Sequence, residues 1–318
     1  MSARLRGLAR DTENIVAAGG YRAPDGREHR IAAAVEAARE GTRLFGPQPV
    51  PTPAARPTAT RIEVTGESSL QAARRLATAP ARPGSGPAAP GNGTAVLNFA
   101  SARNPGGGHL NGAQAQEEAL CRASALYTCL LRAPEFYAHH RAHRDPFYTD
   151  RVIHSPAVPV FRDDRGRLLD EPFTTGFLTS PAPNAGVILR RTPERAPEIP
   201  GALAERAGRV LETAAAVGHR RLVLGAWGCG VFRNDPVQVA GAFRALIGPG
   251  GRFAGAFEHV VLAILDRTPA GRTRAAFEDA FAGLAVTPEA ADQPGAADHP
   301  GAAHHPQAAH HPQAAARP

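Results

Sequence analysis

The sequence predicts an α/β protein whose helices cover both faces of a central sheet. Strand-like apolar segments alternate with helical ones over about residues 61–284, which is the pattern of α/β folds. Two of these strands, 95–100 and 221–226, precede glycine-rich loops at 105–109 and 225–230, and a helical segment follows each loop. In open α/β sheets ligands bind outside the carboxyl ends of the strands, so a binding crevice is expected at these loops.

The first part of the chain is predicted to be helical. Residues 2–17 and 28–43 both place apolar side chains at helical spacing. A proline-rich connector, GPQPVPTPAARPTAT, follows at 46–60. We therefore predict an N-terminal helical extension over residues 1–60 that packs on a core domain over residues 61–286.

The core domain is predicted to contain strands and helices in turn. Strands are expected at 61–65, 95–100, 151–161, in the first part of 171–186, at 221–226 and at 259–266. Helices are expected at 68–77, 113–132, 202–218, 235–246 and 270–283. Ser68 is positioned to cap the first of these helices, and 113–132 has the strongest helical pattern. Residues 79–93, rich in proline and glycine, are predicted to be a flexible loop.

The C-terminal segment has a different composition. Residues 287–318 repeat alanine, proline and histidine with a period of six residues and have little apolar bulk. Such a segment cannot form a core, so we predict a disordered tail. Its histidines could hold a metal ion loosely, but disorder alone is the simpler interpretation.

The composition limits the classes of partner. All 36 basic residues are arginines, and with 29 acidic residues the net charge is +7. This surplus favours a polyanionic partner such as a nucleotide or nucleic acid, although an arginine-rich coding habit alone would also produce it. The three cysteines have no metal-binding spacing, which predicts a reducing, cytoplasmic location. No apolar stretch has the length of a signal peptide core or a membrane span.

Both glycine-rich loops are suited to binding phosphate. In PGGGH (105–109) and GAWGCG (225–230), the absence of side chains lets main-chain N–H groups turn toward an anion. Two facing loops could hold a diphosphate between them. Neither loop has the GxxxxGK[ST] or GxGxxG pattern, which argues against a P-loop enzyme and a dinucleotide dehydrogenase.

Two adjacent glutamates begin the helix after the first loop. Adjacent helical residues are about 100° apart, so Glu117 and Glu118 are expected to point in different directions and to have different roles. A simpler explanation is that acidic residues favour the first turn of any helix. The nearby glycine turn makes acid–base chemistry on a phosphate-bearing substrate the more attractive hypothesis.

Residues 98–118, NFASARNPGGGHLNGAQAQEE, resemble the signature of bacterial-type poly(ADP-ribose) glycohydrolases, a catalytic branch of the macrodomain fold. That signature is GGG followed after six to eight residues by QEE, and the gap here is seven. The resemblance extends over roughly residues 3–284 and includes YTDRVIHSPAVPVFRD (148–163) and GAWGCGVFRNDP (225–236). It implies a macrodomain-like three-layer α/β/α sandwich with a mixed central sheet and an N-terminal helical extension.

The resemblance also implies a set of site residues. Glu118 would be the catalytic residue, Glu117 would bind ribose hydroxyls, and Asn104 would contact the distal ribose. The residues expected to bind the rest of the substrate are Gly106, Gly107, Gly108 and Gln116 on one side and Gly228, Cys229, Gly230, Val231 and Phe232 on the other. The adenine pocket has only candidate segments, 64–68 and the SPAPN loop at 180–184.

The implied activity is hydrolysis of the ribose–ribose O-glycosidic bonds of poly(ADP-ribose), from chain ends, with release of ADP-ribose. Glu118 would donate a proton to the leaving oxygen and then activate water. No metal, cofactor, membrane or obligate protein partner is expected; the partners would be poly(ADP-ribose), ADP-ribose and ADP-ribosylated proteins. The alternatives are a macrodomain that binds ADP-ribose without cutting, a mono-ADP-ribosyl hydrolase, and a nucleic-acid binder.

Overall fold

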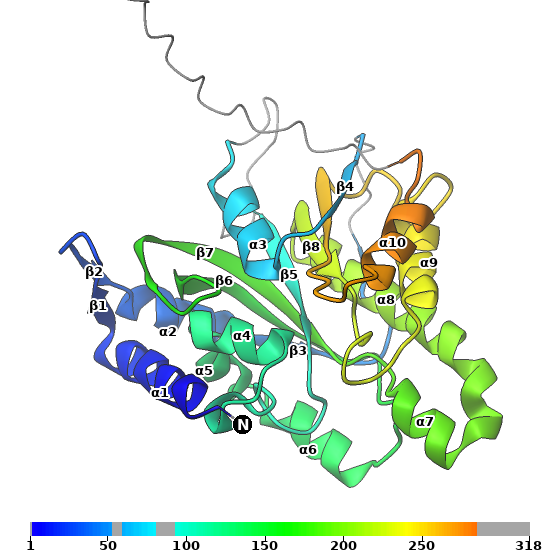
Figure 1. Cartoon of the computed structure of the whole chain (residues 1–318), viewed down its shortest axis with the longest axis horizontal. Coiled ribbons are helices and arrows are strands. Elements are labelled where there is room, and N and C mark those ends of the chain that lie inside the picture. Colours follow the sequence, from blue (N-terminus) through cyan, green and yellow to red (C-terminus); the bar gives the residue numbers. More distant parts are fainter. Residues whose placement is uncertain (1, 53–58, 81–92, 285–318) are drawn as a thin grey trace, which may run out of the picture. The chain divides into compact units, whose positions relative to one another are not determined.

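A seven-stranded mixed β-sheet forms the central layer of the part of the chain that the structure, a computed structural model, describes: residues 2–52, 59–80 and 93–284 (Figure 1). From edge to edge its strands are β3 (Arg43–Phe45), β6 (Val152–Arg162), β7 (Leu168–Ser180), β5 (Thr94–Phe99), β8 (Arg221–Gly225), β9 (His259–Ala263) and β4 (Arg61–Thr65). The five strands from β7 to β4 run parallel, whereas β6 is antiparallel to β7 and β3 is antiparallel to β6.

Helices pack on both faces of this sheet. One face is covered by α1 (Ala3–Ala18), α2 (Ala32–Gly41), α3 (Ser69–Thr78), α4 (Gln116–Ala123), α5 (Leu126–Leu130) and α6 (Pro134–Ala142). The other face is covered by α7 (Ala185–Arg191), α8 (Ile199–Ala216), α9 (Pro236–Ile247) and α10 (Arg272–Ala280). The expected three-layer α/β/α arrangement is confirmed.

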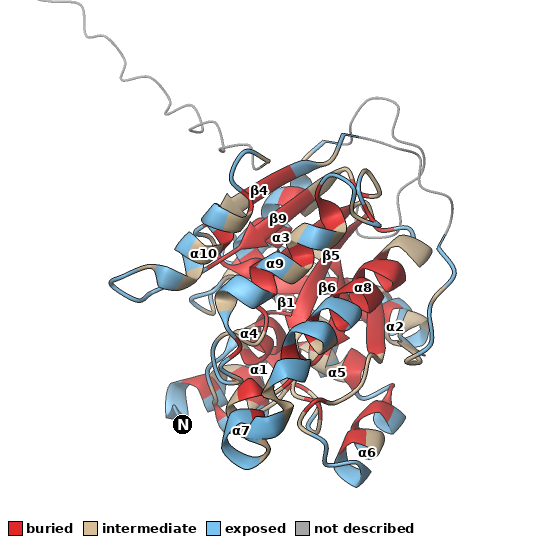
Figure 2. Ribbon diagram, turned by 90° about the vertical axis from the view of Figure 1, so that its right-hand side faces the viewer, coloured by how far each residue is buried: buried red, intermediate tan, exposed pale blue. Residues whose placement is uncertain are grey.

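The apolar strands of the sequence are explained by burial on both faces. Side chains alternate across a strand, so neighbouring residues enter different cores. In β5, Val96 lies in the core beneath α1–α6 and Leu97 in the core beneath α7–α10. Figure 2 shows the buried strands between helices whose outer sides are exposed. Because both faces are covered, these strands are continuously apolar rather than alternating.

Local sequence signals fix several helix ends. Ser2 caps α1, which ends at Gly19 with a left-handed φ of 71°. Ser68 forms a capping box with Gln71 at the start of α3, as the sequence predicts. Asp235 caps α9 through the N–H of Val237.

Most of the predicted elements are present. Strands occur at or within 61–65, 95–100, 151–161, 171–186, 221–226 and 259–266, and helices at or within 2–17, 68–77, 202–218, 235–246 and 270–283, with end shifts of a few residues. Two short 3₁₀ helices also occur, His109–Asn111 and Pro193–Glu198.

The predicted helix over 28–43 is wrong at both ends. Residues Glu28–Arg30 form β2, which pairs with β1 (Gly20–Arg22) as a hairpin. At the other end β3 leaves the helical extension and pairs with β6 at the edge of the main sheet. The N-terminal region therefore supplies a strand to the sheet as well as helices to its face, and the proposed boundary at residue 60 remains a prediction.

The single helix predicted over 113–132 is also wrong, because the chain breaks between α4 and α5. Ser124 is extended, with φ −147° and ψ 176°, and forms a β-bridge with Val160. Its hydroxyl bonds the carbonyl of Leu120 and accepts from the N–H of Leu126. A tertiary bridge to β6 thus interrupts a continuous helical pattern.

Two predictions fall largely on residues that the structure does not describe. Residues 81–92 of the predicted flexible loop and the predicted tail over 287–318 lie outside the described ranges. Within those ranges, every helix is too short or too polar to span a membrane.

Candidate active site

A cleft of about 700 Å³ lies at the carboxyl ends of the parallel strands. Phe99, at the end of β5, lines it, as do the loops that follow β8 and β9. Its other walls come from the first turn of α3, one side of α4, and the turn between β6 and β7. This is the expected crevice of an α/β sheet, and its size suits a ligand of nucleotide dimensions.

Glu117 and Glu118 begin α4 and are both buried, at 3% and 8% exposure. Glu117 accepts hydrogen bonds from the N–H of Ser101 at 2.7 Å and from the side-chain amide of Asn98 at 3.3 Å. Glu118 accepts through Oε1 from the N–H of Gly108 at 2.9 Å. Its Oε2 is buried and has no hydrogen-bond partner among the described residues.

The two carboxylates therefore have different partners but reach the same turn, residues 101–108. Helical geometry alone predicts different directions for them. The long side chains at the first turn of α4 instead fold back onto the preceding turn, as first-turn glutamates can. Gly107 lies between them: a Cβ there would overlap Oε1 of Glu118 and lie 3.1 Å from Oε2 of Glu117. Gly107 also has a φ of 59°, which favours glycine.

The electrostatic environment favours a proton on Glu117. Burial is the main cause that raises its pKa, and the charge of Glu118 adds to it; these outweigh the hydrogen bonds from Ser101, Asn98 and Gly106, so the pKa rises to about 8. Glu117 is therefore mostly neutral at neutral pH. The two glutamates therefore have different environments: Glu117 has several hydrogen-bond donors, whereas Glu118 has one donor and a buried oxygen without a partner among the described residues.

Gln116 lines the cleft, but its amide is already occupied. Its Oε1 accepts from the N–H of Phe99 at 2.9 Å, and its Nε2 donates to the carbonyl of Leu97 at 2.9 Å and the hydroxyl of Ser69 at 3.1 Å. These bonds tie the start of α4 to β5 and to α3. They fix the position from which the two glutamates project.

The second glycine-rich loop forms another wall of the cleft, which the five residues from Gly228 to Phe232 line. Two hydrogen bonds hold the loop to the end of β7 and the segment after it. The indole of Trp227 donates to the carbonyl of Ser180 at 3.0 Å, and the side-chain amide of Asn234 donates to the carbonyl of Pro183 at 2.8 Å. Gly228 has a φ of 73°. Val231 is 78% exposed, and the half-buried Phe232 has its ring 5.9 Å from that of Tyr148.

The remaining predicted residues differ in whether they line the cleft. Gly106, Gly107 and Gly108 adjoin the two carboxylates and are not among the cleft-lining residues. Asn104 is exposed on the same turn and also does not line the cleft. Of the adenine candidates, Ser68 and Ala182 line the cleft.

Several lining residues were not predicted from the sequence. They are Arg4, Leu5 and Leu8 of α1, Asp163–Gly166 of the β6–β7 turn, Arg122 of α4 and Asp266–Thr268 after β9. Asp164 also accepts a 2.7 Å hydrogen bond from Ser68, so two cleft walls are joined. The turn sequence DDRG at 163–166 was a visible signal for a tight connection, but tertiary packing alone brings it to the cleft.

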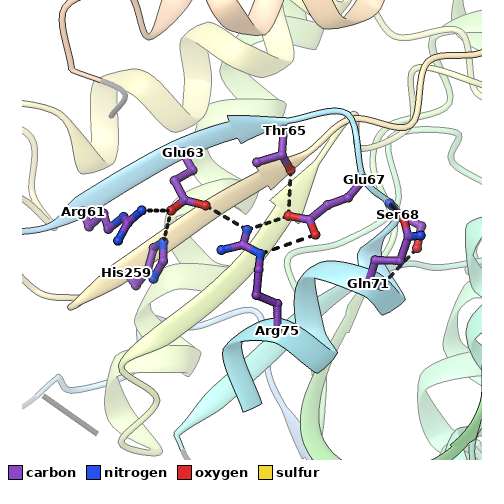
Figure 3. A network of polar contacts seen from close by, with 8 residues as sticks. All are labelled: Arg61, Glu63, Thr65, Glu67, Ser68, Gln71, Arg75 and His259. Atoms are coloured by element: carbon purple, nitrogen blue, oxygen red, sulfur yellow. Dashed lines mark hydrogen bonds and ion pairs between the residues drawn. The ribbon is translucent and has the colours of Figure 1, made fainter. Parts of the chain in front are cut away.

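An ionic network around the buried Glu63 supports the wall that contains Ser68 (Figure 3). Glu63 of β4 is fully buried and contacts Arg61 at 2.7 Å, Arg75 at 2.8 Å and His259 at 3.1 Å. Burial raises the pKa of Glu63, but His259 and Arg75 outweigh it and lower the pKa to about 2. Arg75 also contacts Glu67 at 2.6 Å, directly before Ser68. The network thus fixes the 65–68 turn against β4.

The described ranges contain no group of three or more histidine, cysteine, aspartate or glutamate side chains arranged to hold a metal ion. The cleft is lined by carboxylate, arginine, hydroxyl and side-chain amide groups, and the adjoining 101–108 turn adds main-chain amides.

Comparisons with known proteins find one enzyme family. A family model for the catalytic domain of microbial-type PARG matches residues 9–163. The crystal structure of poly(ADP-ribose) glycohydrolase from Thermomonospora curvata has a TM-score of 0.80 and 48% identity, covering 88% of this chain and 100% of that one. None of the curated proteins compared with the chain matches it.

Two further solved structures contain ligands. The Thermomonospora curvata enzyme bound to the inhibitor ADP-HPD has a TM-score of 0.77 and 49% identity, covering 87% of this chain and 99% of that one. The Deinococcus radiodurans enzyme in complex with ADP-ribose has a TM-score of 0.69 and 45% identity, covering 79% of this chain and 98% of that one.

Proposed function

The chain belongs to the microbial-type poly(ADP-ribose) glycohydrolases, and from that premise we propose that Glu118 performs the acid–base chemistry of the reaction. The protein is a glycosidase that hydrolyses poly(ADP-ribose). The proposal assigns the cleavage step to particular side chains. The observation on which it rests is the buried, unpartnered Oε2 of Glu118 beside a turn of main-chain amides.

We place the terminal ADP-ribose unit of the polymer in the cleft. Similar enzymes bind ADP-ribose and ADP-HPD, and the cleft volume of about 700 Å³ accommodates such a ligand. The loop from Gly228 to Phe232 would hold the diphosphate with its main-chain N–H groups, as glycine-rich turns do. Phe232 would pack against the distal ribose and orient it toward α4.

The bond that breaks joins C1″ of the distal ribose to O2′ of the preceding unit. Glu118 in its protonated form donates its proton to O2′ as the C–O bond breaks, leaving positive charge on the ribose. The resulting carboxylate takes a proton from the incoming water, whose oxygen bonds to C1″. Glu118 ends the cycle protonated, and the products are ADP-ribose and a shortened polymer.

The other motif residues support this step. Glu117, held neutral by burial, would bind ribose hydroxyls next to the reacting carbon. Asn104 and Gly106–Gly108 would border the distal ribose and the scissile bond. Gln116 would position α4 rather than bind substrate, because its amide is fully used by Phe99, Leu97 and Ser69.

The test is release of free ADP-ribose from automodified poly(ADP-ribose), with protein carrying single ADP-ribose units as a parallel substrate. We expect ADP-ribose alone from the polymer, since cleavage from chain ends produces no oligomers. Oligomeric products would contradict the chain-end part of the proposal. Release only from mono-ADP-ribosylated protein would instead favour a mono-ADP-ribosyl hydrolase.

ADP-ribosylated proteins are the proposed macromolecular partners. The three free cysteines favour a cytoplasmic location.

A further inference from the structure

A group of basic side chains lies on and after α6, whose Arg141 contacts the turn that binds Glu118. Its members are exposed or half-buried and come from that turn, from the end of α6 and from the segment leading into β6: Arg103, Arg141, His143, Arg144 and Arg151. We call this group the α6 basic surface. The cleavage step proposed for Glu118 does not use it.

The α6 basic surface is connected to the active site by direct contacts. Arg103 belongs to the same turn as Gly108, the partner of Glu118, and its carbonyl accepts a 2.8 Å hydrogen bond from Arg141. A second connection runs through aromatic rings. Phe232 lies 5.9 Å from Tyr148, whose ring lies 5.8 Å from that of His140 on α6.

The positive charge of this surface is not neutralised within the described part of the chain. None of its arginines forms an ion pair there, and the buried Nε of Arg103 has no hydrogen-bond partner. The two acids next to Arg144 and Arg151 in the sequence pair with other arginines: Asp145 contacts Arg195 at 3.4 Å, and Asp150 contacts Arg206 at 2.9 Å.

His139 of α6 packs against this surface. Its ring stacks on that of His143 with centroids 4.2 Å apart. Desolvation, followed by the charges of Arg151 and His143, lowers the pKa of His139. Cations that repel one another in the free protein would be stabilised by an anion placed among them.

The substrate supplies such an anion at this position. The proposed function, on which this inference rests, leaves one ADP-ribose unit in the cleft and the rest of the polymer beyond the scissile oxygen. The first unit beyond that oxygen carries its own diphosphate. Glu118, which protonates that oxygen, is bonded to the turn that carries Arg103, and we therefore place the departing chain along this turn.

We infer that the α6 basic surface binds the diphosphates of the polymer on the leaving side of the scissile bond. Its occupant is therefore the ADP-ribose unit next to the terminal one in poly(ADP-ribose). The surface makes the affinity for polymer higher than the affinity for free ADP-ribose. Binding of this kind depends on salt, because each neutralised phosphate releases a counterion.

The test uses the double variant Arg144→Glu/Arg151→Glu, compared with Arg30→Glu/Arg74→Glu. The control arginines are exposed and form no ion pair within the described ranges. Arg74 lies on α3, which is near the top of the view in Figure 1, whereas α6 is at the bottom. Both double variants change the net charge by the same amount, so a general charge effect would appear in both.

We expect the α6 variant to raise KM for long poly(ADP-ribose) by about tenfold, with kcat at saturation unchanged. The slope of log KM against log salt concentration should be smaller by roughly 1.4, the value for two lost phosphate contacts on a single strand. The control variant should behave like the wild type. Affinity for free ADP-ribose should be the same in all three proteins, because that unit lies in the cleft.

Equal KM and equal salt slopes in the two double variants would overturn the inference. An equal loss of ADP-ribose affinity and polymer affinity would overturn it as well, because the surface would then act on the cleft. Polymer binding is also measured in the Glu118→Gln background, without turnover. Failure of the Glu118 assignment would appear as wild-type cleavage by Glu118→Gln, and the α6 surface would then be judged from KM and the salt slopes of the two double variants alone.

Discussion

Glu118 accepts a 2.9 Å hydrogen bond from the main-chain N–H of Gly108 through one carboxylate oxygen and keeps the other oxygen free of partners among the described residues. The occupied oxygen fixes the orientation of the carboxyl group. The free oxygen is the one that can meet a substrate atom. A buried carboxylate oxygen without a partner is costly to the folded protein, so the arrangement is consistent with a position completed by substrate.

Replacing Glu118 by glutamine tests the role of that oxygen. Glutamine has nearly the same shape and its amide oxygen can still accept from Gly108, but it cannot donate and recover a proton. We expect Glu118→Gln to lower the rate of ADP-ribose release by about 10²–10⁴-fold, the usual contribution of a general acid. Calorimetric affinity for ADP-ribose should be retained. Near wild-type release from polymer would refute the assignment.

Replacing Gly107 by alanine tests whether the glycine turn is required to position the two carboxylates. Alanine there adopts an unfavourable φ of 59° and places its Cβ against both glutamates. We expect Gly107→Ala to cost about 1–2 kcal/mol of stability from backbone strain and to lower kcat on the order of 10²-fold by displacing the carboxylates.

The matched control for that variant is Gly250→Ala. Gly250 also has a positive φ, 77°, but its added Cβ meets no atom within 4 Å. It should therefore show a similar loss in thermal unfolding experiments with kcat unchanged. If both variants keep full activity, the glycine turn does not position the glutamates.

Glu117 should make stability depend on pH. Its folded pKa of about 8 is above the ordinary value of 4.5. The folded protein thus holds a proton that the unfolded chain releases, so this contribution to stability is complete below pH 4.5 and is lost as pH rises through 8. Glu117→Gln should remove the loss while keeping the bond from Ser101. Urea unfolding between pH 5 and about 9 measures the difference; parallel curves for the two proteins would contradict the raised pKa.

The parts of the fold that were predictable are those whose signal is local. β5 and β8 are short apolar runs because they are buried on both faces, and Ser68 is a recognisable cap. The break at Ser124 was not visible, because apolar residues continue at helical spacing across it and the interruption comes from a bridge to Val160. β3 has three residues, too few for a period, and its pairing with β6 depends on a distant strand.

The candidate site divides in the same way. Glu117, Glu118 and the two glycine loops follow from motifs within short stretches of sequence. The occupied amide of Gln116 was not foreseeable, because its partners come from β5 and α3. Arg4 and Asp164 enter the cleft from α1 and the β6–β7 turn, and no local pattern indicates which surface turn will face a ligand.

A buried histidine pair outside the active site predicts acid sensitivity. His154 of β6 and His219, just before β8, have their Nε2 atoms 2.9 Å apart, so one donates and the other accepts, and protonation of the accepting nitrogen would break the bond. Burial, with the neighbouring His219 and Arg43, lowers the pKa of His154 to about 3, and burial lowers that of His219 to about 4. The ordinary pKa of both side chains is 6.5.

The unfolded chain therefore binds protons below pH 6.5 that the folded protein does not, and stability falls as pH drops from 6.5 toward 4. His154→Gln removes one of the two titrating groups. Its unfolding free energy should fall less steeply over this range, by about 1.4 kcal/mol per pH unit. The wild-type protein, unfolded over the same pH range, is the reference. If His154→Gln keeps the wild-type slope, His154 titrates alike in the folded and unfolded states, and the buried pair does not cause the acid sensitivity.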